Sequence, residues 1–145
     1  MIVYFDNAAT TPLDEDVFQT MLPYMRQHFG NPSSAHKHGR MAKSAIETAR
    51  KTIADILNVG VNEIFFTSGG TEADNTAIFS AVRGLGIRHA ITSRLEHPAV
   101  LKTLNSLQDK GEITLSFVFN DDDGNLDLDH LEQLLQSKLK SRKFV

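Results

Sequence analysis

The sequence predicts an α/β fold with a parallel, doubly wound sheet, and two observations support this. Short apolar runs alternate with longer segments that have the spacing of amphipathic helices. This alternation is typical of parallel strands joined by right-handed helical crossovers. The predicted strands are residues 64–67, 88–92 and 113–119. The helices that follow them are predicted at residues 71–83, 98–110 and 127–140.

The first sixty residues are predicted to form an extended arm and two helices. Residues 1–13 are rich in small and turn-favouring residues, and Asp14 is expected to cap the first helix. Pro23 lies inside the pattern of that helix and is expected to kink it. A loop at residues 30–34 then precedes a long amphipathic helix. The apolar stripe of this second helix consists of Ala42, Ala45, Ile46, Ala49, Ile53, Ile56 and Leu57.

The composition is that of an ordinary globular protein, with 145 residues, 41% of them hydrophobic and 23% charged. The net charge of −3 argues against a protein that binds the phosphate backbone of a nucleic acid. No apolar run is long enough to cross a bilayer, so no membrane partner is expected. The N-terminal residues lack the basic segment of a secretory signal, and we therefore expect a cytoplasmic protein. The chain has no cysteine, which excludes thiol catalysis and thiolate metal ligands from its own residues.

Residues 65–75 have the pattern of a strand, a small glycine-containing turn and the start of a helix. Backbone N–H groups at such a turn converge on one point, and the helix dipole favours an anion such as phosphate there. The turn has neither the spaced glycines of a dinucleotide site nor the lysine of a Walker loop, so a bound phosphate would belong to another cofactor. An ordinary turn in which Thr71 caps the helix is the equally good alternative.

His97 follows the second predicted strand, and Pro98 after it suits the first position of a helix. His97 is therefore expected to cap that helix at the carboxyl end of the strand. Ligands of open α/β sheets bind at this edge, where the turn at residues 68–71 would also lie. A surface cap without a ligand is the alternative for His97.

No metal site is expected from the sequence. No two of the remaining histidines have the spacing of a helical zinc pair. The acidic run at residues 121–123 is interpreted as a solvated turn, because three adjacent carboxylates cannot all face one ion.

Four segments resemble the signatures of cysteine desulfurases of the NifS/IscS type, in the order and spacing of that family. They are residues 4–12, 30–40, 66–72 and 96–100. The family belongs to the class V aminotransferases. The resemblance therefore implies an incomplete three-layer αβα sheet of the aspartate-aminotransferase (fold type I) kind, with pyridoxal 5′-phosphate as the cofactor. Residues 1–13 would be an arm that associates with the small domain, and residues 14–145 the first part of the large cofactor-binding domain.

The resemblance also implies the roles of several residues. Gly70 and Thr71 match the pair that binds the cofactor phosphate. His97 matches the catalytic histidine that stacks on the pyridine ring and assists proton transfer. The segment on the substrate side of the pocket is matched by Asn7, Ala8 and Ala9.

A complete enzyme of this family would take sulfur from L-cysteine as an enzyme persulfide, release alanine, and supply iron–sulfur cluster or thio-cofactor synthesis. This chemistry needs a loop cysteine and a lysine that holds the cofactor, and the chain offers no cysteine and no lysine in the family's context. We therefore expect the N-terminal portion of a cysteine desulfurase, a fragment or truncated product that is inactive by itself. Its expected partners are a sulfur acceptor or scaffold protein, and either a second copy in a homodimer or a C-terminal partner chain.

Three other hypotheses stay open. A selenocysteine lyase, or another class V enzyme, would share this half of the pattern. The chain could also be a non-catalytic interaction module, or half of a split enzyme completed by a separate polypeptide.

Residues 143–145 resemble the beginning of a fourth strand, which would leave a sheet edge open.

Overall fold

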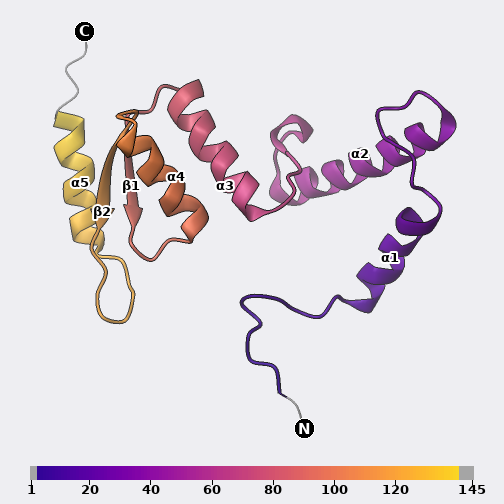
Figure 1. Ribbon diagram of the computed structural model, residues 1–145, viewed down its shortest axis with the longest axis horizontal. Helices are drawn as coiled ribbons and strands as arrows, with labels where there is room; N and C mark the ends of the chain where they lie inside the picture. The colour runs from indigo at the N-terminus through magenta and orange to yellow at the C-terminus, as the bar shows by residue number, and fades with distance from the viewer. Residues whose placement is uncertain (1–2, 141–145) are drawn as a thin grey trace. The chain divides into compact units, whose positions relative to one another are not determined.

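A computed structural model of the chain describes residues 3–140 (Figure 1). The chain divides between Phe65 and Phe66 into two compact units. The first unit contains α1 (Glu15–Arg26), α2 (Lys37–Leu57) and the short 3-10 helix η1 (Val61–Glu63). The second contains α3 (Gly70–Phe79), the π-helical turn η2 (Ser80–Gly84), β1 (His89–Ser93), α4 (Pro98–Asp109), β2 (Thr114–Val118) and α5 (Leu128–Lys140).

Helix α1 begins and ends for local reasons. The Asp14 carboxylate accepts hydrogen bonds from two backbone N–H groups of the first turn, at 3.0 and 3.2 Å, which confirms the predicted cap. The helix runs through Pro23 and ends three residues later at Arg26. There the Pro23 carbonyl accepts the N–H groups of Gln27 and His28, at 2.8 and 2.9 Å.

The loop before α2 lies against the first turn of that helix with no room for extra side chains. A Cβ at Gly39 would lie 2.2 Å from the Ser34 carbonyl oxygen and 2.6 Å from that of Asn31. A Cβ at Gly30 would lie 2.4 Å from the carbonyl oxygen of His38. Because these neighbours are backbone atoms, only glycine allows the loop and the helix to approach so closely.

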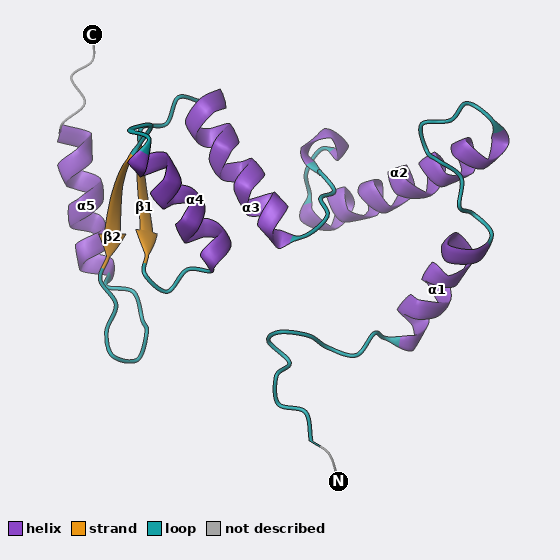
Figure 2. Cartoon of the chain, viewed as in Figure 1, coloured by secondary structure: helices purple, strands orange, loops and turns teal. Residues whose placement is uncertain are grey.

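The second unit contains a parallel strand pair with helices packed against it (Figure 2). Strands β1 and β2 pair in register, from His89 opposite Thr114 to Ser93 opposite Val118, and α4 connects them. In Figure 1, α4 and α5 lie on the two sides of the strands. The buried core cluster consists of Val82, Leu104, Leu107 and Ile113.

An ion pair fastens the π-helical turn to the segment before β2. The Arg83 guanidinium donates two hydrogen bonds to the Glu112 carboxylate, each at 2.9 Å. The Arg83 side chain is 52% exposed, so solvent screens the pair and its contribution to stability is small.

The α/β class and most elements match the sequence prediction, but the strand expected at residues 64–67 is wrong. This segment lies between η1 and α3 and pairs with no strand among residues 3–140. An apolar run becomes a strand only where a neighbour accepts its backbone hydrogen bonds, and Phe65 stays 79% exposed. The helix predicted at 71–83 begins one residue earlier and changes to a π-helical turn at Ser80.

Residues 143–145, expected to begin a strand, lie outside the described residues. Within residues 3–140, none of the helices combines the length and the apolar character needed to span a bilayer.

We predict that Gly39→Ala lowers the free energy of unfolding by about 1–3 kcal/mol, because the added methyl group overlaps backbone atoms of the loop. Urea titration followed by circular dichroism would measure the change. Gly84→Ala is the control, since a Cβ at Gly84 meets no atom within 4 Å. Equal urea midpoints of unfolding for Gly39→Ala and Gly84→Ala would contradict the close approach of the loop to the first turn of α2.

Candidate functional site

The start of α3 presents free backbone donors beside open space. The helix begins at Gly70, with Gly69 as its N-cap. The first N–H groups of a helix have no partner within it, and those of Gly70 and Thr71 make no hydrogen bond to any part of the chain that the structure describes. A Cβ added at Gly69 or Gly70 would meet no atom within 4 Å. This arrangement suits a phosphate group.

Thr71 does not cap α3, so the alternative prediction of a Thr71 cap is wrong. The helix already includes Gly70, which makes Thr71 its second residue. Its hydroxyl has no hydrogen-bond partner among residues 3–140 and is exposed. It is therefore available to a ligand at the start of the helix.

Glu72 holds the turn before α3 closed. One oxygen of its carboxylate accepts the Ser68 hydroxyl at 2.6 Å and the Ser68 backbone N–H at 2.7 Å. The hydroxyl bond, followed by the backbone bond, holds the pKa of Glu72 below its ordinary value of 4.5. The charged carboxylate therefore stabilises the turn that carries the free donors.

A polar groove of about 580 Å³ follows this face of α3. It is lined by Ser68, Thr71, Glu72, Asn75, Thr76, Phe79 and Ser80. Hydroxyl, amide and carboxylate groups therefore surround the space next to the free N–H groups. A larger and more apolar groove of about 830 Å³ lies in the first unit, along α1 and α2.

His97 caps α4, as the sequence predicts. Its Nδ1 accepts the backbone N–H of Ala99 at 3.1 Å, and Pro98 is the first residue of the helix. The side chain is exposed, and Nε2 makes no hydrogen bond within residues 3–140. The ring face and one ring nitrogen are therefore open to a ligand.

Within the second unit, the starts of α3 and α4 lie at the same end. The two helices pack along each other, and in Figure 1 they run in the same direction and begin at the end where the arrow of β1 points. The starts of α3 and α4, which carry Gly70, Thr71 and His97, thus lie at the end toward which β1 points, and ligands of α/β proteins bind at this end of their strands. The arrangement can hold an anion at α3 and a ring next to His97.

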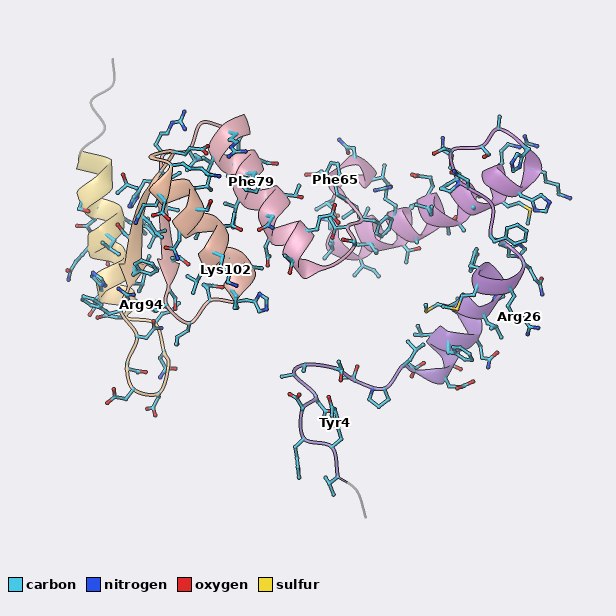
Figure 3. The ribbon with its side chains drawn as sticks, in the orientation of Figure 1. Tyr4, Arg26, Phe65, Phe79, Arg94 and Lys102 are labelled. Carbon is cyan, nitrogen blue, oxygen red and sulfur yellow. The ribbon has the colours of Figure 1, made fainter. Side chains whose placement is uncertain are left out.

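Asn7, Ala8 and Ala9 belong to the first unit and form an exposed turn. The carbonyl of Asp6 accepts the N–H groups of Ala9 and Thr10 at 3.0 and 3.3 Å. The Tyr4 hydroxyl, labelled in Figure 3, donates to the same carbonyl at 2.9 Å. A substrate-side role for this turn stays a prediction.

The acidic run after β2 forms a turn, as expected. The Asp121 carboxylate accepts the Asn125 side chain at 3.0 Å and the Asn125 N–H at 2.8 Å, and these bonds lower its pKa. Among residues 3–140, no three ligating side chains gather as a metal site would require.

Sequence reasoning assigned no role to Glu72, Asn75 or Thr103. The contact between Ser68 and Glu72 is local, but its four-residue spacing differs from the three-residue spacing of a capping box, so no standard pattern indicates it. The Thr103 hydroxyl donates to Asn75 Oδ1 at 2.5 Å across 28 residues of sequence, and no local pattern indicates such a contact.

The fold and the site place the chain in a known class: it belongs to the aminotransferase class-V family, whose profile matches residues 3–142. Its relatives include the cysteine desulfurase IscS of Methanosarcina thermophila, 53% identical over 116 residues, which are 77% of this chain and 28% of that protein. A cysteine desulfurase of Nostoc sp. is 43% identical over 135 residues, 92% of this chain and 34% of that protein. The chain thus spans about a third of the length of the curated relatives it matches.

The solved structures give the same assignment. A NifS-like protein superposes with a TM-score of 0.85 at 40% identity, over 92% of this chain and 37% of that one. A structure described as SspA in complex with cysteine gives a TM-score of 0.80 at 36% identity, over 90% of this chain and 38% of that one. The predicted resemblance to NifS/IscS proteins and the fold type I assignment are confirmed.

We predict that Glu72→Gln reduces the loss of stability on acidification. The folded-state pKa of Glu72 is lowered, so its contribution is present above pH 4.5 and is lost as the pH falls through the folded-state value. Thermal melts between about pH 3 and pH 7 would show a flatter profile for the variant. Glu112 and Asp121, whose pKa values are also lowered, would keep part of the slope.

Glu132→Gln is the control for this experiment, because among residues 3–140 the Glu132 carboxylate accepts one hydrogen bond, from the Gln136 amide of the same helix at 2.8 Å. An identical pH profile for Glu72→Gln and the unchanged chain would show that the Ser68 bonds do not close the turn in solution.

Proposed function

We propose that this chain is the N-terminal, phosphate-binding part of a pyridoxal 5′-phosphate-dependent cysteine desulfurase. The observation that carries the proposal is the pair of free donors at Gly70 and Thr71 on the same edge as His97. The named cysteine desulfurases among the relatives support the reaction class. The structure described as SspA in complex with cysteine supports L-cysteine as the substrate.

The residues present fit the cofactor's phosphate. The N–H groups of Gly70 and Thr71 and the Thr71 hydroxyl would hold it, aided by the dipole of α3. The open space in front of Gly69 and Gly70 admits a group of this size without side-chain overlap. When bound, pyridoxal 5′-phosphate supplies an electron sink for the substrate's α-carbon.

His97 would contact the cofactor ring and present one defined nitrogen, Nε2, to a ligand. Because Nδ1 accepts the Ala99 N–H, the neutral imidazole carries its proton on Nε2. In this tautomer Nε2 presents an N–H that can donate to a ligand at this edge, whereas the lone pair that could take up a proton is the one on Nδ1, which holds the cap. The capping bond also fixes the orientation of the ring, which a proton-transfer group requires.

The chain does not supply the nucleophile. It has no cysteine, so the attack on the sulfur of L-cysteine requires another polypeptide segment. The proposal also includes partners. One is a sulfur acceptor or scaffold protein, and the other is a second subunit or a C-terminal partner chain. The arm at residues 1–13 would associate with the small domain of the whole enzyme, and residues 14–145 would belong to its large domain. A cytoplasmic location stays a prediction.

The alternatives share the same site chemistry. A selenocysteine lyase or another class V enzyme would use the same phosphate turn and ring histidine. An interaction module or half of a split enzyme is favoured by one observation, the exposure of large apolar side chains such as Leu85 (79%) in the second unit.

We predict that Thr71→Val weakens the binding of pyridoxine 5′-phosphate by about fivefold to tenfold, because one hydrogen bond to a charged group is lost. This ligand has no aldehyde and therefore needs no lysine. Isothermal titration calorimetry would measure the affinity, and pyridoxine without phosphate should be insensitive to the change. Thr76→Val, on the same helix and in the same groove, is the matched control. Equal losses for the two variants would contradict a phosphate site at Thr71.

We also predict that the purified chain alone releases neither sulfide nor alanine from L-cysteine, because it has no thiol to attack the sulfur. Sulfide and alanine assays would measure this, together with an intact mass under denaturing conditions and an absorbance scan for a pyridoxal band. A second polypeptide that copurifies with the band and with activity would indicate a split enzyme. Turnover by a single 16.1 kDa species would contradict the proposal that the nucleophile comes from another polypeptide segment.

A further inference from the structure

One side-chain contact joins α3 to α4 at the same number of residues from the start of each helix. The Thr103 hydroxyl donates to Asn75 Oδ1 at 2.5 Å, and both side chains are half-buried. Asn75 is the sixth residue of α3 and Thr103 is the sixth residue of α4. The contact therefore lies at the same distance from the first residues of the two helices, about 7.5 Å along each axis at the usual rise of an α-helix.

The contact continues to His97 through α4. The Thr103 hydroxyl lies 2.8 Å from the Ala99 carbonyl oxygen, and the N–H of Ala99 donates to His97 Nδ1 at 3.1 Å. The hydroxyl has one proton, which the Asn75 and Ala99 oxygens share as alternative acceptors. Asn75, Thr103, Ala99 and His97 thus neighbour one another through polar contacts, in which the Thr103 proton goes either to Asn75 or to Ala99.

The same contacts reach the phosphate donors on the other side. Asn75 lies one turn after Thr71, on the same face of α3, and both residues line the polar groove. The chain between Thr71 and His97 includes the rest of α3, η2 and β1. Its covalent connectivity alone does not fix the spacing between the two ends of the site.

We infer that Asn75 and Thr103 are positioning residues of the cofactor site, whose contact sets the register of α3 against α4 and thereby the spacing between the phosphate donors and His97. The inference rests on the proposed function, because it assumes that one ligand contacts both helix starts. A ligand that spans the two points benefits from a fixed spacing, whereas a ligand held at one point does not.

Two probes separate these cases on the 145-residue chain. Under the proposed function, inorganic phosphate would contact the start of α3 alone, whereas pyridoxine 5′-phosphate would also reach the ring of His97. Asn75→Ala and Thr103→Val each remove the contact, and Thr103→Val keeps the shape of the side chain. Nuclear magnetic resonance titrations, followed at the Gly70 and Thr71 amides and at the His97 ring, would give both affinities.

We expect both variants to bind pyridoxine 5′-phosphate about fivefold more weakly, with the affinity for inorganic phosphate unchanged within about twofold. The double variant should lose no more than either single one, because the residues share one contact. Thr103→Ser keeps the hydroxyl and should retain the affinity of the unchanged chain. Thr52→Val is the matched control, because the Thr52 hydroxyl donates to the Thr48 carbonyl within α2 at 3.0 Å and joins no other helix.

If the variants lose affinity equally for the two probes, or lose none for either, the inference is overturned. Asn75 and Thr103 would then have a structural role alone. If the unchanged chain binds neither probe, the proposed function fails instead. The positioning role is then decided without a ligand, by the His97 ring nitrogen signals and by hydrogen exchange at the Ala99 N–H. Both must change in Thr103→Val and stay constant in Thr52→Val, and constancy in both variants would overturn the inference.

Discussion

The parallel pairing of β1 with β2 determines the geometry of the second unit. Two parallel neighbours need a crossover that returns the chain to the same end of the sheet, and α4 is that crossover. Its buried face, through Leu104 and Leu107, packs with Val82 and Ile113 to form the core. Since α4 must begin where β1 ends, His97 lies at the carboxyl edge. Helix α3 packs beside α4 and brings Gly70 and Thr71 to the same end.

Few of the described hydrophobic side chains are fully buried. Leu107 is 1% exposed and Val82 is 2% exposed, but Phe5, Phe65 and Leu85 are between 79% and 91% exposed. Apolar side chains exposed to this degree contribute little hydrophobic stabilisation and usually mark surfaces that other polypeptide covers. Within residues 3–140, the small core therefore leaves large apolar side chains such as Phe65 and Leu85 uncovered.

Features encoded by neighbouring residues were predictable from the sequence, and features that depend on distant contacts were not. The caps at Asp14 and His97 were predictable because a capping side chain acts within three residues of itself. The strand at residues 64–67 was predicted wrongly, because its formation depends on a partner strand that its own residues do not specify. Of the two readings left open for Thr71, the cap is wrong because the helix already begins at Gly70. The contact between Asn75 and Thr103 spans 28 residues and becomes visible only once α3 and α4 are packed.

The cap on α4 gives His97 two tasks that compete for one ring. A proton added at Nδ1 turns that atom from an acceptor into a donor, which deprives the Ala99 N–H of its partner. The helix therefore needs Nδ1 as an acceptor, which leaves Nε2 and the ring face for a ligand. One side chain thus begins α4 and also limits the contacts of a ligand at this edge to an N–H donor and a ring face.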